Sequence, residues 1–137
     1  MEKVIDILLV EDDTVDVMDA QRTLDRMGLI YKMHVSRNGE EALTWLNESA
    51  NRPDVILLDL NMPKMNGVEF LHSLKASSRW KDIKVFVITT SDEREDRETT
   101  KALGVSGYIV KPLKFNNPSS IDSFNLMIDL MNIKNRI

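Results

Sequence analysis

The sequence predicts an α/β fold in which helices cover both faces of a parallel β-sheet. Three observations lead to this prediction. The 137 residues contain four short, nearly continuous runs of Val, Ile and Leu, which are typical of strands buried on both faces. Segments with a helical spacing of apolar residues separate these runs, so strands and helices alternate along the chain. The length, with 42% hydrophobic and 29% charged residues, fits one domain over residues 1–137.

The expected strands are assigned from local composition. Four of them are the apolar runs at residues 4–10, 54–60, 84–89 and 107–110. A fifth strand at residues 31–35 alternates apolar with polar side chains, which is typical of the edge of a sheet.

Five helical patterns lie between and after these strands. They cover residues 14–27, 40–47, 68–76, 93–103 and 120–134. Gly28 and Gly104 follow the first and the fourth pattern, where glycine commonly ends a helix. Ser119 and Asp122 match a capping box at the start of the last helix.

The alternation of strands and helices also predicts the strand order. Right-handed crossovers join parallel strands, and five such units fit a flavodoxin-like, doubly wound sheet with the order 2-1-3-4-5 and five helices. Ligands of these sheets bind beyond the carboxyl ends of the strands. The residues at these ends are therefore the first candidates for a functional site.

Composition and charge exclude several classes of function. The net charge is −4, whereas nucleic-acid-binding domains usually carry clustered excess Lys and Arg. The absence of cysteine excludes disulfides, thiolate catalysis and zinc–thiolate sites. No run approaches the roughly 18 apolar residues of a membrane span, and the apolar run at the N-terminus is too short for a signal peptide. We therefore expect a cytoplasmic protein that binds neither nucleic acid nor membranes.

Polar side chains follow the strands at the expected carboxyl edge of the sheet. These residues are Glu11, Asp12, Asp59, Thr89 and Lys111. Each of them alone is common in a turn, a helix cap or a strand, but the strands that carry them are neighbours in the order 2-1-3-4-5. Three carboxylates, a hydroxyl and an ammonium group therefore converge on one crevice.

The converging carboxylates predict a metal ion. They repel one another unless a cation neutralises them. Oxygen ligands with high negative charge suit a hard cation, and we expect Mg²⁺ in preference to zinc or copper. Because Mg²⁺ often completes its shell with substrate oxygens, a phosphate-bearing substrate is indicated. The same acids disfavour a flavin nucleotide, whose phosphate they would repel.

Four longer segments carry these residues, namely ILLVEDD, PDVILLDLNMPKMNG, VFVITTSD and GVSGYIVKP. Together they resemble the receiver domain of bacterial response regulators, the chemotaxis-regulator-like family. The stretches LLVEDD…D, RPDVILLDLNMPKMNG and VITTSDERED are also similar to small stand-alone receivers that are paired with phytochrome-type histidine kinases. The resemblance implies a two-component phosphorelay with a sensor histidine kinase as partner, and we expect no effector domain.

The resemblance assigns roles to the acids of the crevice. Asp59 corresponds to the phosphoacceptor, and Asp12 corresponds to a direct metal ligand. Glu11 corresponds to an acid that acts through a metal-bound water, and Asp13 is a second choice. Asn61 would offer its backbone carbonyl to the metal.

The resemblance also implies a switch. Lys111 would pair with one phosphoryl oxygen, and Thr89 would form a hydrogen bond with another. Tyr108 corresponds to an aromatic residue whose rotamer follows the phosphorylation state, and the Lys111–Pro112 bond corresponds to one that is cis in the family. We therefore expect a phosphoacceptor that assists its own phosphorylation and dephosphorylation, rather than an enzyme.

Two other functions remain open. The chain could be a receiver-like interaction scaffold that is never phosphorylated, although the intact acids and Lys111 argue against this alternative. A metal-dependent phosphatase is a more distant alternative, because Asn61 stands where a second acid is usual, two residues after the nucleophile.

The fourth helical pattern is almost entirely polar. We expect ion pairs of Glu93 with Arg97 and of Arg94 with Glu98 to support it. Such a composition is typical of a solvated helix. The alternative is a weakly anchored helix that moves easily on phosphorylation.

The last helical pattern has two apolar stripes. The first, which we expect to face the sheet, consists of Ile121, Phe124, Ile128 and Met131. The second consists of Leu126, Leu130 and Ile133. Because a helix on a sheet needs only one stripe, we expect the second to form a homodimer or partner contact on the face of the fourth helix, fifth strand and fifth helix. The alternatives are cover by the C-terminal tail or tolerated exposure.

Overall fold

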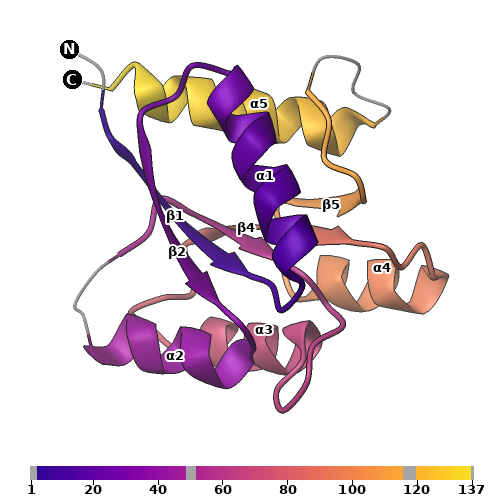
Figure 1. The fold of residues 1–137 in the computed structure, drawn as a ribbon. Helices are drawn as coiled ribbons and strands as arrows, with labels where there is room; N and C mark the ends of the chain where they lie inside the picture. The colour runs from indigo at the N-terminus through magenta and orange to yellow at the C-terminus, as the bar shows by residue number, and fades with distance from the viewer. Residues whose placement is uncertain (1–2, 49–51, 116–119, 137) are drawn as a thin grey trace.

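The computed structural model describes residues 3–48, 52–115 and 120–136 and confirms the expected α/β fold (Figure 1). Its sheet has five parallel strands in the order β2-β1-β3-β4-β5. The strands are β1 (Ile5–Val10), β2 (Tyr31–Ser36), β3 (Val55–Leu58), β4 (Lys84–Thr89) and β5 (Gly107–Val110). The strand expected at residues 54–60 is shorter than predicted, so Asp59 lies just beyond the end of β3.

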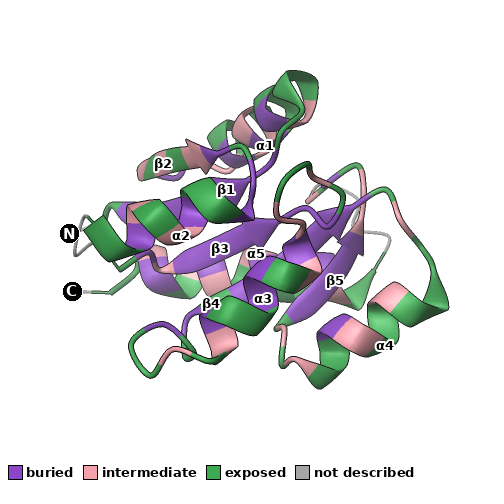
Figure 2. Ribbon diagram, turned by 90° about the horizontal axis from the view of Figure 1, so that it is seen from below, coloured by how far each residue is buried: buried purple, intermediate pink, exposed green. Residues whose placement is uncertain are grey.

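Helices cover both faces of this sheet. They are α1 (Thr14–Arg26), α2 (Gly39–Glu48), α3 (Gly67–Lys75), α4 (Arg94–Ala102) and α5 (Ile121–Lys134). Figure 1 shows α1 and α5 on one face and α2 and α3 on the other, with α4 beside β5. Figure 2 shows that β1, β3, β4 and β5 are buried almost throughout, while the edge strand β2 is partly exposed and the helices expose their outer faces.

Strand β1 shows why the sheet holds two cores. Its side chains alternate, so Ile5, Ile7 and Leu9 belong to the core under α1 and α5, whereas Leu8 and Val10 belong to the core under α2 and α3. All five are buried. A strand that serves both cores needs a continuous apolar run, which is the pattern the sequence shows.

The helix ends fit the sequence with one change. Gly28 and Gly104 have φ angles of 68° and 82° after α1 and α4, as expected of glycines that end helices. The cap of α5 is Ser120, whose side chain accepts a hydrogen bond from the backbone N–H of Ser123. The expected cap residue, Ser119, lies outside the described residues.

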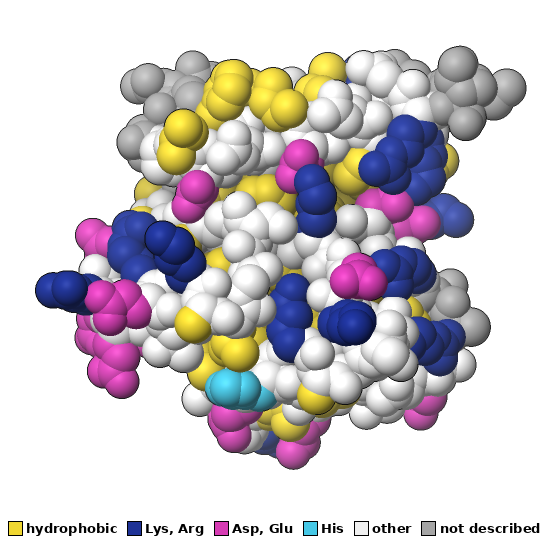
Figure 3. Space-filling view, turned by 180° about the vertical axis from the view of Figure 1, so that it is seen from behind, with side chains coloured by type: hydrophobic (Ala, Val, Ile, Leu, Met, Phe, Trp, Pro, Cys, Tyr) yellow, Lys and Arg dark blue, Asp and Glu magenta, His cyan; other side chains and the backbone are white. Residues whose placement is uncertain are grey.

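The prediction for α5 is wrong about which stripe faces the sheet. The supposed interface residues Leu126, Leu130 and Ile133 are buried in the core. The supposed core residues Ile121, Phe124 and Ile128 are 75%, 46% and 41% exposed, and Met131 is partly buried. Figure 3 shows hydrophobic side chains gathered along the α5 edge of the molecule, at the top of the view.

A polar contact accompanies this orientation of α5. The carboxylate of Asp122 accepts a hydrogen bond of 2.8 Å from the backbone N–H of Tyr108 in β5. This contact fixes the first turn of α5 on the sheet, and Leu126 and Leu130, four and eight residues later, then face the core. The two stripes have the same spacing, so hydrophobicity alone does not distinguish them.

Helix α4 has little contact with the core, which agrees with its almost entirely polar sequence. Thr100 is its only buried residue. The ion pair of Arg94 with Glu98 is present at 2.7 Å, but Arg97 pairs with Asp92 at 2.6 Å rather than with Glu93. Within the described part of the chain, no helix is long and apolar enough to cross a membrane.

Candidate functional site

Three acidic side chains meet at the carboxyl edge of the sheet. Glu11 and Asp12 follow β1, and Asp59 follows β3, which is the neighbour of β1. The backbone N–H of Glu11 donates to Ser36 O at 2.9 Å, and that of Asp59 donates to Val10 O at 3.0 Å. The sheet ladder therefore extends to both acids and holds their backbones in place. One carboxylate oxygen from each of the three acids lies within 4.8 Å of the others.

The three acids differ in exposure. Glu11 and Asp59 are only 3% and 6% exposed, whereas Asp12 lies at the surface. Burial raises the pKa of Glu11 from 4.5 to about 7; the hydrogen bond from Lys111 opposes this rise, and the charge of Asp59 adds to it. A cation in the crevice would therefore favour the charged form of Glu11.

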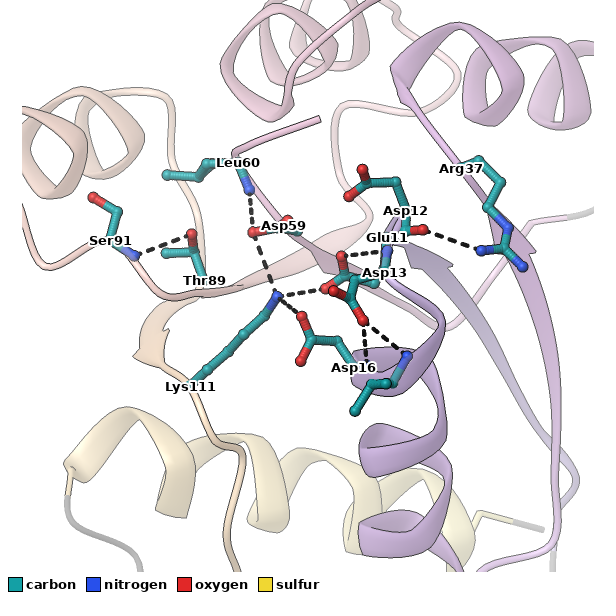
Figure 4. Close-up of polar contacts among 11 residues, drawn as sticks. Glu11, Asp12, Asp13, Asp16, Arg37, Asp59, Leu60, Thr89, Ser91 and Lys111 are labelled. Carbon is teal, nitrogen blue, oxygen red and sulfur yellow. Dashed lines mark hydrogen bonds and ion pairs between the residues drawn. The ribbon is translucent and has the colours of Figure 1, made fainter. Parts of the chain in front are cut away.

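Lys111 brings the positive charge of the site. It directly follows β5, and its Nζ lies 2.6 Å from Glu11 Oε1, 2.7 Å from Asp16 Oδ2 and 3.8 Å from Asp59 Oδ1 (Figure 4). Burial alone would lower the pKa of Lys111, but hydrogen bonds to Asp16 and Glu11 and the charge of Asp59 outweigh it and raise the pKa. Lys111 is thus a stable cation that faces the phosphoacceptor candidate. The Lys111–Pro112 bond is cis, as expected.

Asp16 is the residue that the sequence analysis missed. It lies in the first turn of α1, and the cap of that helix aims it at the crevice. The cap is Asp13, whose Oδ1 accepts hydrogen bonds from Val15 N at 2.8 Å and from Asp16 N at 3.2 Å. Asp13 therefore ends the loop after β1 and is absent from the acidic cluster. The sequence signal for this residue is an acidic side chain in the first turn of the helix that begins at the crevice.

Asp59 is held by its own neighbours in the chain. Its Oδ1 accepts a hydrogen bond of 2.9 Å from Leu60 N. A Cβ atom at Gly67 would lie 2.5 Å from Asp59 O, so only glycine lets α3 start this close to Asp59. Asn61 lies in the intervening loop with its side chain exposed. The same loop is tied to the start of α2 by a hydrogen bond of 2.9 Å from Gly39 N to Met65 O.

The switch candidates lie on the other side of Asp59. Thr89 ends β4, and its Oγ1 accepts a long hydrogen bond of 3.4 Å from Ser91 N. Figure 4 shows Thr89 and Ser91 on the side of Asp59 opposite to Glu11. Tyr108 is buried, and its hydroxyl donates to Ser91 O at 2.8 Å. The structure therefore brings Thr89 to the crevice and connects Tyr108 to the β4–α4 loop rather than to the acids.

The donor set indicates which ion fits. Glu11, Asp12 and Asp59 offer only carboxylate oxygens, and His and Cys take no part in this cluster of the described residues. Hard cations with oxygen ligands suit such a set. The guanidinium of Arg37 donates to the backbone oxygen of Asp12 at 3.1 Å. The site is thus suited to a divalent cation and a second, phosphate-like anion.

Comparisons with known sequences identify the family of this chain. The family model for the response regulator receiver domain matches residues 7–119. The probable methanogenesis regulatory protein FilR2 of Methanothrix harundinacea is 37% identical over 115 residues, which cover 81% of this chain and 74% of FilR2. The response regulator Rcp1 of Synechocystis is 36% identical over 77% of this chain and 75% of its own length. The chemotaxis protein CheY1 of Helicobacter pylori is 33% identical over 77% and 84%.

Solved structures give the same result. The phosphorylated cyanobacterial phytochrome response regulator RcpA superposes with a TM-score of 0.76 and 32% identity, over 96% of this chain and 90% of RcpA. The Mn²⁺-bound form of Rcp1 has a TM-score of 0.77 and 31% identity, over 96% of both chains. The bacteriophytochrome response regulator AtBRR has a TM-score of 0.78 and 32% identity, over 98% and 97%. The chain therefore belongs to the response regulator receiver domain family of two-component systems.

Proposed function

We propose that this receiver accepts a phosphoryl group on Asp59 from a sensor histidine kinase. The observation that carries the proposal is the position of Asp59, which is buried beside two other acids and 3.8 Å from the ammonium of Lys111. An isolated buried carboxylate would be costly. Here it is oriented by Leu60 N and faced by a cation, so it is held ready as a nucleophile.

The proposed transfer is a displacement at phosphorus. An Asp59 carboxylate oxygen forms a bond to phosphorus, and the bond from phosphorus to the imidazole nitrogen of the kinase breaks, so that the histidine leaves with the electron pair of that bond. Lys111 faces the negative charge of the transferred group. Asp12, Asp59 and the backbone carbonyl of Asn61, with Glu11 acting through a water, would hold Mg²⁺. This ion supplies further positive charge at the phosphoryl group.

A switch through Thr89 fits the contacts of the β4–α4 loop. A phosphoryl group adds a charge of about −1.5 to −2 and accepts strong hydrogen bonds. Drawing the Thr89 hydroxyl toward it would loosen the long bond to Ser91 N. Ser91 also donates to Asp96 Oδ2 at 2.6 Å and accepts from Tyr108 at its carbonyl, so its movement reaches α4 and β5. We propose that this is how the α4-β5-α5 surface changes.

We propose a phytochrome-type histidine kinase as partner. The similarity to RcpA, Rcp1 and AtBRR supports this choice, because RcpA and AtBRR are described as phytochrome and bacteriophytochrome response regulators. We also propose a homodimer through α4-β5-α5. Its apolar centre would be the exposed Ile121, Phe124 and Ile128, in place of the buried second stripe. We place the protein in the cytoplasm, without a nucleic-acid partner.

The decisive experiment is incubation with acetyl phosphate, with and without Mg²⁺, followed by intact mass measurement. We expect the mass of one phosphoryl group in the presence of Mg²⁺, and none for Asp59→Asn or after EDTA treatment. Labelling of Asp59→Asn would place the acceptor elsewhere. No labelling of the wild type would favour the alternative of a scaffold that is never phosphorylated.

A further inference from the structure

Asp16 shares the ammonium of Lys111 with the acids of the crevice. The 2.7 Å contact between Asp16 Oδ2 and Lys111 Nζ is nearly as short as the 2.6 Å contact between Glu11 Oε1 and Lys111 Nζ. Both are charge-assisted hydrogen bonds, which are among the stronger polar contacts in proteins. In contrast, Asp59 Oδ1 lies 3.8 Å from the same nitrogen, beyond hydrogen-bond distance.

Most of the hydrogen-bond donors of the Lys111 ammonium are therefore already used by carboxylates other than Asp59. A lysine ammonium has three N–H groups, and two of them are taken by Glu11 and Asp16. A phosphoryl group on Asp59 presents three oxygens and a charge of about −1.5 to −2. It competes for Lys111 with the two carboxylates that already hold it.

The carboxylates of Glu11 and Asp16 differ in the cost of losing their contact with Lys111. The side chain of Glu11 is 4% exposed and that of Asp16 is 31% exposed. If released, Asp16 regains water at the mouth of the crevice, whereas Glu11 would stay buried and unpaired. A cavity of about 50 Å³, lined by Asp16, Asp59 and Lys111 among others, lies where these side chains would rearrange.

We propose that Asp16 is a positioning residue that retains the ammonium of Lys111 in the unphosphorylated protein and releases it when Asp59 carries the phosphoryl group. This inference rests on the proposed function, because it requires a phosphoryl group at Asp59. Asp16 then opposes phosphorylation in two ways. It holds the ammonium of Lys111 that the phosphoryl group would contact. Its own negative charge, in the lining of the same cavity as Asp59, would also repel the phosphoryl group.

Thermodynamic linkage makes the inference measurable. A contact present only in the free protein disfavours the bound state by its own free energy. Removing the charge of Asp16 should therefore destabilise the free protein more than the bound protein. It should also increase the affinity for a phosphoryl mimic.

The test uses beryllofluoride with Mg²⁺ as the mimic, titrated into the full chain and followed by the amide resonances of Asp59 and Leu60. The variants are Asp16→Asn and Asp16→Ala, with Asp16→Glu as the conservative rescue. Asp19→Asn is the matched control, because Asp19 lines the same cavity from the next turn of α1 but pairs with Arg22 at 3.5 Å instead of with Lys111.

We expect Asp16→Asn and Asp16→Ala to bind beryllofluoride about two- to fivefold more tightly than the wild type. This change in affinity corresponds to the free energy that a partly exposed ion pair usually contributes. Asp16→Glu should restore the wild-type affinity, and Asp19→Asn should differ little from it. The melting temperature should fall more for free than for beryllofluoride-bound Asp16→Asn.

Other outcomes separate the two proposals. Unchanged or weaker binding by Asp16→Asn and Asp16→Ala would overturn the inference, because Asp16 would then be neutral or would orient Lys111 for the phosphoryl group. An equal gain in Asp19→Asn would overturn it too, because net charge alone would explain the effect. A wild type without Mg²⁺-dependent binding of beryllofluoride would instead contradict the proposed phosphoacceptor site.

Discussion

The guanidinium of Arg97 in α4 lies over the ring of Tyr108 in β5, with its central carbon 4.7 Å from the ring centroid. The same arginine pairs with Asp92 at 2.6 Å, and the hydroxyl of Tyr108 donates to Ser91 O. The β4–α4 loop, α4 and β5 are thus connected around one aromatic ring. A cation over an aromatic face stabilises by about 0.5–1 kcal/mol at exposed sites.

Loss of the Tyr108 hydroxyl should separate the phosphorylation of Asp59 from the response of α4. Tyr108→Phe removes the bond to Ser91 O and should lower the free energy of unfolding by about 1 kcal/mol. Phosphorylation of Asp59 should continue, but the shifts that it causes in the α4 amide resonances should shrink. The control is Tyr31→Phe, which loses a 2.8 Å bond to Asp25 far from β5 and should leave those shifts intact. Full α4 shifts in Tyr108→Phe would exclude Tyr108 from the switch.

Lys111→Ala should keep the fold and slow phosphorylation. The substitution removes the ammonium that faces Asp59, and loss of one such charge-stabilising donor commonly costs about 10²-fold in rate. The measurement is the rate of mass labelling by acetyl phosphate. Lys84→Ala, which breaks a surface pair with Asp129, is the control and should label like the wild type. Labelling of Lys111→Ala at the wild-type rate would remove Lys111 from the mechanism.

Glu11 should make the metal-free protein less stable as the pH rises. Burial raises the pKa of this carboxyl from 4.5 to about 7, so the folded protein keeps a proton that the unfolded chain has already lost. The contribution of Glu11 to stability is complete below pH 4.5 and is lost as the pH passes through about 7. Its slope cannot exceed about 1.4 kcal/mol per pH unit.

Urea unfolding in EDTA across this pH window measures the effect, with Glu11→Gln as the control that should lack this component of the slope. The affinity for Mg²⁺ should rise over the same window, because the metal requires the ionised carboxylate. A metal-free stability curve identical in the wild type and Glu11→Gln would contradict the shifted pKa.

Phe124→Glu should convert the proposed dimer to a monomer. Phe124 is 46% exposed in the middle of the apolar face of α5, so the charge enters the interface without entering the core. Sedimentation velocity over a range of concentrations, with and without beryllofluoride, measures the change. Asn125→Glu adds the same charge at an exposed neighbouring position and should have less effect. A wild type that stays monomeric at high concentration in both states would exclude the dimer.

Much of the site was predictable because parallel strands bring their carboxyl ends to one edge. Glu11, Asp59 and Lys111 each stand directly after a strand and Asp12 follows one residue later, so their meeting follows from the strand order alone. Asp16 does not follow a strand. Its direction depends on where α1 begins and how Asp13 caps it, which the sequence pattern fixes only to within a residue or two.

The rotation of α5 shows a different limit. Its two stripes repeat at the same intervals, and both contain large apolar side chains. The stripe that faces the core is the one compatible with the contact from Tyr108 N to Asp122, which joins residues 14 positions apart, and with the core packing of Leu126, Leu130 and Ile133. Periodicity describes a helix in isolation, whereas such a contact depends on the neighbouring strand.

The hydrogen bond from Gly39 N to Met65 O has a consequence for the direction of signalling. It fixes the loop after Asp59 to the start of α2, and Met65 packs against the core under α2 and α3. The loop after Asp59 is thus fastened to the body of the protein, whereas α4, beyond the β4–α4 loop, has a single buried residue. A new charge at Asp59 should therefore displace α4 more than the loop that follows Asp59. Substitutions that pack α4 more tightly on the sheet should leave phosphorylation as easy as in the wild type but should prevent the change of the α4 surface.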